Sequence, residues 1–320
     1  MDRQTVQALK DKDNVDSLFL VKEKNVSVGK NGRPFMGLQL GDATGTIDAR
    51  LWDRVDELAQ EFETGDILRV KGQVQLFQNR RQLIVHRLER VDSATVNFEE
   101  FIPQSSRNVE DMMVELLKLV RSMKNDNLRQ LILDTLEDPE IRPKILRAPA
   151  AKSIHHAWVG GLLEHILSIC KIMDFMANHY SFLNRDLLLF GAIFHDIGKI
   201  WELSYDHGIS YTDRGRLIGH MQIACELIDK KSSRILGFDE ELRDICKHII
   251  LSHHGKLEYG SPKRPKFLEA MVIAMVDDFD SKVATVKTVI DGEKGSGEKW
   301  SRYNELFDRY FLLEDLNEKY

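Results

Sequence analysis

The chain has 320 residues, 42% of them apolar and 30% charged, and a formal net charge of −6. This composition excludes a mostly disordered chain and a protein with positive potential over its whole surface, so a nucleic-acid site would have to be a local patch. Because no apolar run approaches the roughly 20 residues that span a bilayer, and the start MDRQTVQALKDKDN is too polar for a signal peptide, we expect a cytoplasmic protein without a membrane partner.

The first part of the chain is typical of a small β-barrel. Residues 1–13 predict a helical extension, and residues 14–95 contain five segments in which apolar and polar side chains alternate. A short helical stretch, DRVDELAQEF, lies between the third and fourth of these segments. This order predicts a five-stranded OB-like barrel, a fold that often binds single-stranded nucleic acid, although other small barrels with five strands also fit.

From about residue 109 the apolar period becomes that of amphipathic helices. Residues 96–108 contain a proline and a polar Ser/Arg/Asn run, and they predict a linker. Residues 109–320 predict an all-α domain with a final short helix, RYNELFDRYFLLEDL, so the chain is expected to be an α+β protein of two domains. Its three single cysteines predict buried, reduced thiols: Cys170, Cys225 and Cys246.

Histidines and aspartates form the most informative pattern of the helical region. A single histidine on an apolar helix is more often a packed core residue than a ligand. Seven such side chains, each costing about 1–3 kcal/mol if buried without a partner, could instead share one metal centre. The alternative is a set of unrelated core hydrogen bonds. The seven residues are His165, the adjacent His195 and Asp196, His220, the adjacent His253 and His254, and Asp277.

Several motifs of this region resemble those of a known enzyme superfamily. HDIGK at 195–199, with His165 upstream and Asp277 downstream, resembles the signature of the HD phosphohydrolases, and the other histidines match the additional ligands of dinuclear members. The chain from residue 14 to about residue 285 is similar to the YhaM-type bacterial exoribonucleases, which place an OB-fold before an HD domain. The segments that carry this similarity are HHAWVGGLLEH (155–165), AIFHDIGK (192–199), Tyr211 to His220, LSHHG (251–255) and GSPKRP (260–265).

The resemblance implies a metal-dependent phosphodiesterase that removes nucleotides from the 3′ end of single-stranded RNA, with single-stranded DNA as a second substrate. It implies two divalent ions per chain, manganese first, with iron, cobalt, nickel or magnesium as alternatives. Asp277 is preferred to its neighbour Asp278, and Asp280 is either a partner of a ligand or a plain capping residue. The implied ligands are His165, His195, Asp196 and Asp277 for one ion, and the bridging Asp196 with His220, His253 and His254 for the other.

Further residues are candidates for catalysis. Two ions would activate a water for in-line attack on the phosphate, with the bridging Asp196 at the reaction centre. Lys199, one helical turn beyond His195, is placed to neutralise charge on the phosphoryl oxygens, or else it is a solvated lysine at a helix end. His155 and His156 are candidates for protonating the leaving oxygen or binding phosphate, with helix capping as the alternative.

Nucleic-acid contacts are predicted in two places. In the barrel, Phe35, Trp52 and Phe77 are interleaved with cations, a combination that holds single strands without reading sequence, although at least one of the three is expected to be core. In the helical region, Lys263 and Arg264 predict phosphate contacts or a solvated loop. The cationic candidates of the barrel are Lys30, Arg33, Arg80 and Arg81.

Three functions fit these observations. The first is a 3′→5′ exoribonuclease, as the resemblance implies. The second is an HD phosphohydrolase of a small nucleotide or cyclic dinucleotide, because one scaffold can serve many substrates. The third is a non-catalytic nucleic-acid-binding adaptor with a purely structural HD domain. The sequence leaves open whether the chain forms a homo-oligomer.

Overall fold

Contacts divide the computed structural model into two units. One comprises Met1–Pro103 and Val286–Tyr320, and the other comprises Gln104–Tyr205 and Ile209–Thr285. We refer to them as the barrel unit and the helical unit. The structure describes residues 3–29, 32–78, 80–92, 95–97, 100–102, 105, 107–151, 158–205, 209–294 and 297–316.

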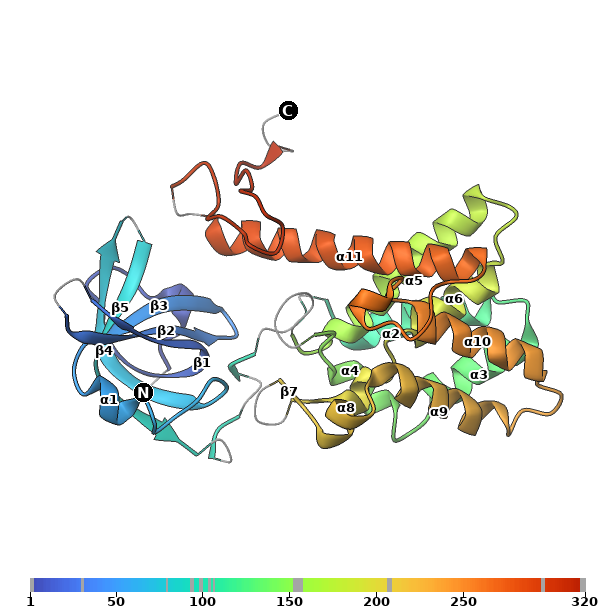
Figure 1. Ribbon diagram of the computed structural model, residues 1–320, viewed down its shortest axis with the longest axis horizontal. Coiled ribbons are helices and arrows are strands. Elements are labelled where there is room, and N and C mark those ends of the chain that lie inside the picture. The colour runs from blue at the N-terminus through green and yellow to red at the C-terminus, as the bar shows by residue number, and fades with distance from the viewer. Residues whose placement is uncertain are drawn as a thin grey trace. The chain divides into compact units, whose positions relative to one another are not determined.

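Five strands close into a barrel (Figure 1). Its order is β1-β2-β3-β5-β4, in which β3 and β5 pair in parallel and β1 pairs with β4 to close the ring. This is the connectivity of an OB-fold, so the predicted fold of the first domain is confirmed. The elements are β1 (Asn14–Val28), β2 (Pro34–Asp42), β3 (Gly45–Leu51), α1 (Val55–Leu58), β4 (Ile67–Phe77) and β5 (Arg80–Val91).

Strand β4 shows how the sequence closes the barrel. Leu68 and Val70 are buried in the core, whereas the intervening Arg69 is exposed, as the alternation predicts. The register of β4 against β5 shifts at Gly72, where a Cβ would lie 2.2 Å from the carbonyl oxygen of Ile84. A glycine is therefore required at this bulge, because a side chain would collide with the backbone of the neighbouring strand.

The segments that flank the barrel pack against it. Only a short 3-10 turn, η1 (Val6–Ala8), forms within the predicted helical extension, and Val6 and Leu9 join the barrel core. Phe101 of the predicted linker is buried beneath the guanidinium of Arg3. The contacts also group residues from Val286 onward with the barrel. The domain limits 1–13, 14–95, 96–108 and 109–320 stay a prediction.

The predicted final helix is wrong over residues 302–312. Isolated bridges pair Trp300 with Leu312 and Asn304 with Arg309, so this segment doubles back on itself. The Asn304 side chain accepts a hydrogen bond from the Phe307 backbone nitrogen at 3.1 Å, and Asp308 has a left-handed φ of 55°. Both features favour a turn over a helix and outweigh the apolar spacing of the segment.

Helices are the main secondary structure of the described part of the helical unit (Figure 1). The side chains of Asn108, Asn125 and Asn184 accept hydrogen bonds from first-turn backbone nitrogens and so begin three of the helices. Two short strands, β6 (Leu203–Ser204) and β7 (Ser210–Tyr211), pair with each other. The helices are α2 (Val109–Arg121), α3 (Asp126–Leu136), α4 (Arg142–Arg147), α5 (Gly161–His179), α6 (Arg185–Phe194), α7 (Lys199–Glu202), α8 (Asp213–Leu217), α9 (His220–Ser232), α10 (Glu240–Ser252) and α11 (Leu268–Glu293).

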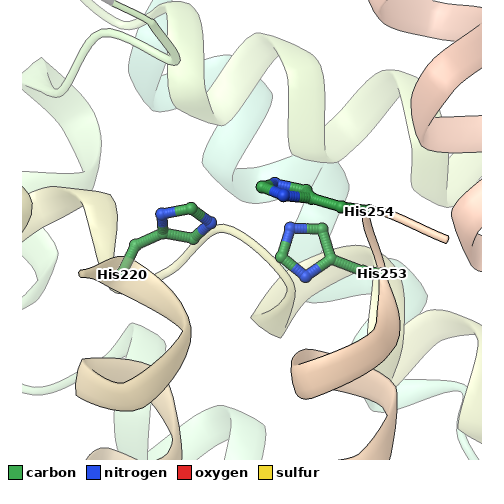
Figure 2. A group of neighbouring side chains, drawn as sticks. All are labelled: His220, His253 and His254. Carbon is green, nitrogen blue, oxygen red and sulfur yellow. The ribbon is translucent and has the colours of Figure 1, made fainter. Parts of the chain in front are cut away.

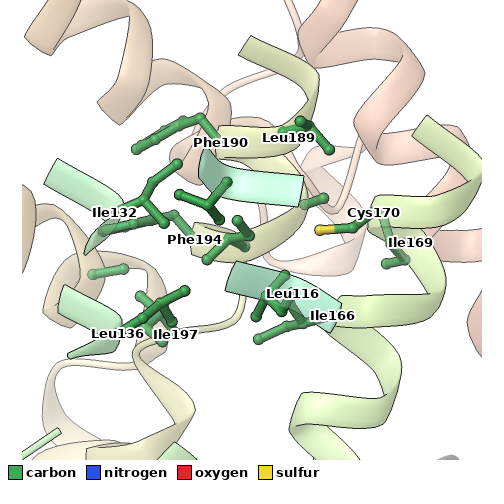
Figure 3. Close-up of a cluster of buried hydrophobic side chains, with 14 of the residues drawn as sticks. Leu116, Ile132, Leu136, Ile166, Ile169, Cys170, Leu189, Phe190, Phe194 and Ile197 are labelled. Atoms are coloured by element: carbon green, nitrogen blue, oxygen red, sulfur yellow. The ribbon is translucent and has the colours of Figure 1, made fainter. Parts of the chain in front are cut away.

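The core of the helical unit is apolar, and many of its residues are neighbours of the predicted ligands in the sequence. Figure 3 shows side chains of α5 and α6 packed against those of α2 and α3, with Ile197 beside them. All three cysteines are free and buried, which confirms the predicted thiols, and burial raises the pKa of the Cys225 thiol to about 11. Among the described residues, no helix is both long and apolar enough to cross a bilayer.

Candidate metal centre

The helical unit contains all seven predicted metal ligands. Most of them lie at helix ends, where side chains can turn away from the helix axis. His220 begins α9, His165 lies within α5, and Asp277 lies within α11. The C-terminal ends of α6 and α10 supply the two adjacent pairs, His195 with Asp196 and His253 with His254.

The first ligand group consists of His165, His195 and Asp277, whose ligand atoms lie within 4.8 Å of one another. Nε2 of His165 lies 3.2 Å from Nε2 of His195 and 3.3 Å from Oδ1 of Asp277. Oδ2 of Asp196 lies 3.5 Å from Nε2 of His195. The structure therefore brings together the four residues implied for one ion.

The second ligand group consists of His220, His253 and His254, again with ligand atoms within 4.8 Å of one another. Figure 2 shows their three rings gathered between the start of α9 and the end of α10. Oδ1 of Asp196 lies 3.6 Å from Nε2 of His220 and 3.7 Å from Nε2 of His253. Because its other oxygen faces the first group, Asp196 occupies the position of a bridging carboxylate.

The His195–Asp196 pair and the His253–His254 pair share one local conformation. His195 and His253 are the C-caps of their helices, and Nδ1 of each donates to a carbonyl oxygen three residues earlier. These bonds are 3.0 Å to Ala192 and 2.7 Å to Ile250. The last carbonyls of a helix have no partner within the helix, so the imidazole supplies one. A carbonyl can only accept, so the hydrogen is on Nδ1 and the lone pair of each Nε2 faces the centre.

A tight turn follows the HD pair. Helix α6 ends at Phe194 and α7 begins at Lys199, so residues 195–198 lie between two helices. A Cβ on Gly198 would lie 2.1 Å from the carbonyl oxygen of His220. Gly198 therefore allows the start of α9 to approach the turn, which brings the His220 imidazole next to Asp196.

Asp280 orients His165. Its carboxylate, 8% exposed, lies 2.8 Å from Nδ1 of His165 and also accepts a hydrogen bond from Ser168. This contact favours a ligand partner over a plain capping residue. Burial lowers the pKa of His165, but the hydrogen bonds that His165 donates to Asp277 and Asp280 outweigh it and raise the pKa to about 9. A metal ion at this nitrogen would have to displace a proton.

Glu202, which the sequence analysis did not single out, orients His220. It is 8% exposed, and its Oε1 accepts hydrogen bonds from both the backbone nitrogen and Nδ1 of His220, at 3.0 Å each. Burial would raise the pKa of Glu202, but His220 lowers it below its usual value, so the carboxylate is charged. The available signal was an acid in the apolar run IWEL, three residues beyond Lys199.

The buried carboxylates of the centre are charged. Burial would raise the pKa of Asp196, but Lys199 and His195 hold it well below its usual value. Nζ of Lys199 lies 2.6 Å from Oδ2 of Asp196, and this contact raises the lysine pKa despite burial. The neighbouring histidines likewise lower the pKa of Asp277 against the effect of burial. Two negative charges therefore face the ligand nitrogens.

Three buried polar atoms of the centre have no hydrogen-bond partner among the described residues. They are Oδ1 of Asp196, Nε2 of His220 and Nε2 of His253. Leaving such atoms unpaired costs about 1–3 kcal/mol each. A divalent cation would satisfy all three at once, because imidazole nitrogens and carboxylate oxygens are its ordinary ligands. The residues present therefore fit divalent metal binding.

Known proteins are similar to both parts of the chain. The model of the HD domain matches residues 162–282, and that of an OB-fold nucleic acid binding domain matches residues 20–91. The 3′-5′ exoribonuclease YhaM of Geobacillus sp. (strain WCH70) is 33% identical over 93% of this chain and 91% of the relative. The protein of the same name from Bacillus subtilis (strain 168) is 33% identical over 93% of this chain and 94% of the relative. The chain belongs to the YhaM family.

Solved structures match a part of this YhaM-family chain. The second OB-fold domain of replication protein A from Methanococcus maripaludis is 22% identical and covers 28% of this chain and 95% of its own, with a TM-score of 0.24. The mitochondrial single-stranded DNA binding protein Rim1 of S. cerevisiae is 9% identical and covers 26% of this chain and 98% of its own, with a TM-score of 0.22. The assignment of the barrel rests on its strand order and on the family model.

The predicted aromatic contacts of this YhaM-family barrel lie on its surface. Phe35 and Trp52 form a tilted pair with ring centroids 5.0 Å apart. Trp52 and Phe77 are about half exposed, at 48% and 58%, and Phe35 is partly buried. None of the three belongs to the buried core of the described barrel, so the expectation that one of them is core is wrong. The core is filled instead by Phe19, Phe62 and aliphatic side chains.

The cationic candidates have diverse surroundings. Arg81 donates from Nη1 to the carbonyl oxygen of Leu9 at 2.6 Å and so holds the N-terminal segment. Arg80 lies 3.3 Å from the Glu293 carboxylate. Arg33 is exposed, as are Lys263 and Arg264 in the loop before α11. Lys30, His155 and His156 lie outside the described residues. Their proposed contacts stay predictions.

Proposed function

We propose that this chain is a cytoplasmic, metal-dependent 3′→5′ exoribonuclease that hydrolyses single-stranded RNA, with single-stranded DNA as a second substrate. The observation that carries the proposal is the position of Asp196 between two ligand groups, with buried donor atoms on both its sides. Family membership supports the reaction class, because the relatives from Geobacillus and Bacillus subtilis both carry the name 3′-5′ exoribonuclease.

Two divalent ions would be held by the seven ligands. The mixed imidazole and carboxylate donors suit manganese, with iron, cobalt, nickel or magnesium as alternatives. When bound, the ions supply Lewis acidity at the phosphate and lower the pKa of a water for attack on phosphorus. The first ion takes His165, His195, Asp196 and Asp277, and the second takes Asp196, His220, His253 and His254.

The protein's own groups prepare this centre. Asp280 and Glu202 each occupy Nδ1 of one histidine, so that Nε2 is left to face the centre. Lys199 keeps its positive charge, compensates the buried Asp196 carboxylate, and is placed to neutralise charge that grows on the phosphoryl oxygens. Fixed donors of this kind need no rearrangement as the reaction proceeds.

The more exposed ligands indicate where the substrate approaches. The side chains of His165, His195 and His253 are fully buried, whereas those of Asp277 and His220 are 16% and 12% exposed. His254 is also partly exposed. The phosphate of the substrate therefore reaches the centre from the side on which Asp277, His220 and His254 lie. His155, His156, Lys263 and Arg264 are the remaining proposed contacts for phosphate or the leaving group.

The barrel retains the single strand during successive cleavages. Its exposed side chains Phe77 and Trp52, with the partly buried Phe35 beside Trp52, offer faces on which bases stack irrespective of sequence. Arg33, Arg80 and Arg81, together with Lys30, are the proposed cationic contacts of the barrel. This division gives the helical unit the chemistry and the barrel the affinity for long substrates.

Hydrolysis of end-labelled oligonucleotides tests the proposal. With manganese, a 5′-labelled single-stranded RNA should give a ladder that shortens from its 3′ end, and a 3′-labelled RNA should release the label at once as a mononucleotide. Parallel reactions with DNA and with the other metals establish substrate and ion preference. Asp196→Asn should abolish the ladder. No degradation of any oligonucleotide with any of these metals would contradict the proposal, and turnover of a cyclic dinucleotide alone would favour the small-substrate alternative.

A further inference from the structure

A pocket of about 300 Å³ lies on the surface of the barrel unit. Strands β1, β2 and β3 line it, and Arg302, from the segment that follows α11, is its lining residue from outside the strands. Its volume lies at the lower end of the range for pockets that hold small ligands or parts of larger ones. No catalytic or metal-binding group proposed above lies in it.

A cation and an aromatic ring line the pocket, and a second ring contacts the first. Arg50 pairs with Gly37 across β2 and β3, and a Cβ on Gly37 would lie 2.6 Å from Nη1 of Arg50. The glycine therefore leaves the space that the guanidinium occupies. The Arg50 guanidinium lies 5.5 Å from the ring centroid of Phe35, which in turn contacts Trp52. Stacking faces beside a cation are the combination that binds single-stranded nucleic acid.

Arg302 is held at this pocket by two contacts. Its Nη2 lies 3.2 Å from Oδ2 of Asp48 on β3. Its backbone nitrogen donates to Oε2 of Glu293 at 3.1 Å, and Glu293 also pairs with Arg80 of β5. The doubling back of residues 300–312 closes the segment on itself. The position of Arg302 thus depends on a backbone anchor as well as on one ion pair.

The Arg302–Asp48 ion pair is easily exchanged. The side chains of Arg302 and Asp48 are 55% and 33% exposed, and ion pairs in contact with solvent contribute little to stability. A phosphate can accept two parallel hydrogen bonds from a guanidinium, and such charge-assisted bonds are strong. Phosphate can therefore replace the Asp48 carboxylate as the partner of Arg302 without disturbing the anchor at Glu293.

We propose that Arg302 is a phosphate-binding residue of the barrel's single-strand site. In the absence of the strand, Asp48 is the ion-pair partner of Arg302. This rests on the proposed function, because the ligand is the single-stranded substrate. The strand places a base against Phe35 and an adjoining phosphate on Arg302 and Arg50. Asp48 competes with the phosphate for Arg302. The segment after α11 is thereby part of the substrate site.

Binding of a fluorescent single-stranded RNA, measured by anisotropy in EDTA so that no hydrolysis occurs, tests this inference. Arg302→Ala should weaken binding by about tenfold, as expected for the loss of a charge-assisted bond. It should also reduce the slope of log K against log salt concentration by about 0.7, the value for one phosphate contact on a single strand. Arg302→Lys should keep the slope and lose part of the affinity. Asp48→Asn should tighten binding, since it removes the competing carboxylate.

Arg69→Ala is the matched control. Arg69 forms a similarly exposed pair with Asp16 on the barrel, with side chains 50% and 38% exposed, but does not line the pocket. It should leave the affinity and the salt slope close to those of the wild type. The inference would be overturned by an unchanged RNA affinity of Arg302→Ala, by an equal loss of affinity in Arg69→Ala, or by weaker binding of Asp48→Asn.

Two outcomes separate this inference from the proposed function. Wild-type protein that degrades and binds RNA while Arg302→Ala binds it equally well would overturn only the role of Arg302. Wild-type protein that neither binds nor degrades single strands would overturn the proposed function and this inference with it.

Discussion

The helical unit and the barrel hold their polar side chains in opposite ways. In the metal centre, Nδ1 of all five histidines has a hydrogen-bond partner, and three of the rings are fully buried. On the barrel, the candidate contacts Trp52 and Phe77 are about half exposed, and Arg302 is held by an exposed ion pair. Burial forces each polar group to have a defined partner, whereas exposure does not. The chemistry is therefore preorganised, and the binding surface is free to adapt to the strand.

The two ligand groups of the centre are built alike. In each group one histidine is oriented by a carboxylate, His165 by Asp280 and His220 by Glu202. The remaining histidines are oriented by backbone carbonyl oxygens of their own helix or loop. A carboxylate partner makes the imidazole a stronger donor to a metal ion. Each ion would thus have one strengthened ligand.

The largest expected effect distinguishes two adjacent aspartates of α11. Asp277→Asn removes a charged ligand from the first group and should lower RNA hydrolysis by about 10⁴-fold or more, as for groups that act as a unit. Asp278 is exposed and lies 2.6 Å from Nζ of Lys282, so Asp278→Asn should retain activity. Single-turnover hydrolysis of end-labelled RNA measures both. If only Asp278→Asn lost activity, the ligand would be Asp278 and the first ligand group would be wrong as described.

The next effect tests whether the Glu202 carboxylate orients His220, a ligand of the second ion. Glu202→Ala should lower the affinity for the second ion about 10–100-fold, because His220 loses the partner of its Nδ1. Glu202→Gln, which still offers an acceptor oxygen, should lose less. Metal content after dialysis against limiting manganese measures this independently of activity. Glu226→Gln, an exposed residue of α9 paired with Arg214, is the control. Two tightly held ions in Glu202→Ala would show that Glu202 has no such role.

A smaller effect is expected on the barrel, where contacts are exposed and shared among several side chains. Trp52→Ala should weaken binding of single-stranded RNA by about 1–3 kcal/mol, the contribution of one stacked base. KM should rise accordingly, and hydrolysis at saturating RNA should fall much less. Leu236→Ala, at an exposed site of the helical unit, serves as control. If Trp52→Ala changed the maximal rate and left KM unaltered, the separation between binding and chemistry would fail.

The smallest effect concerns a histidine outside the centre. Nε2 of His248 accepts a hydrogen bond from the backbone nitrogen of Lys266 at 3.0 Å, and burial together with Lys266 and Lys263 lowers its pKa below 6.5. The unfolded state then binds the proton more readily, so stability is present above pH 6.5 and is lost as the pH falls below it. Urea unfolding in EDTA at pH 8 and pH 5.5 should show a smaller difference for His248→Asn than for the wild type. An identical difference would contradict this account.

The ligands could be predicted because their spacing reflects helix ends. His195 and His253 each cap a helix and are followed by a second polar residue, a pattern that stands out within apolar helical sequence. Glu202 could not be predicted, since its role depends on α7 ending within reach of α9, which is a tertiary contact. The aromatics of the barrel were misjudged in part because alternation does not say how far Phe35 is covered by neighbouring strands.

The C-terminal segment shows a different limit of prediction. Its apolar spacing favours a helix, but the side chain of Asn304 and the left-handed backbone at Asp308 produce a turn. Arg302, which precedes this turn, lies beside Asp48, and the two residues are 254 positions apart in the sequence. Local patterns carry no information about such a pairing.

Anomalous diffraction from crystals grown with manganese would show whether the two ligand groups each bind an ion. Two peaks per chain are expected, one among His165, His195 and Asp277 and the other among His220, His253 and His254, with an oxygen of Asp196 facing each. A single peak, or peaks outside these two groups, would contradict this expectation.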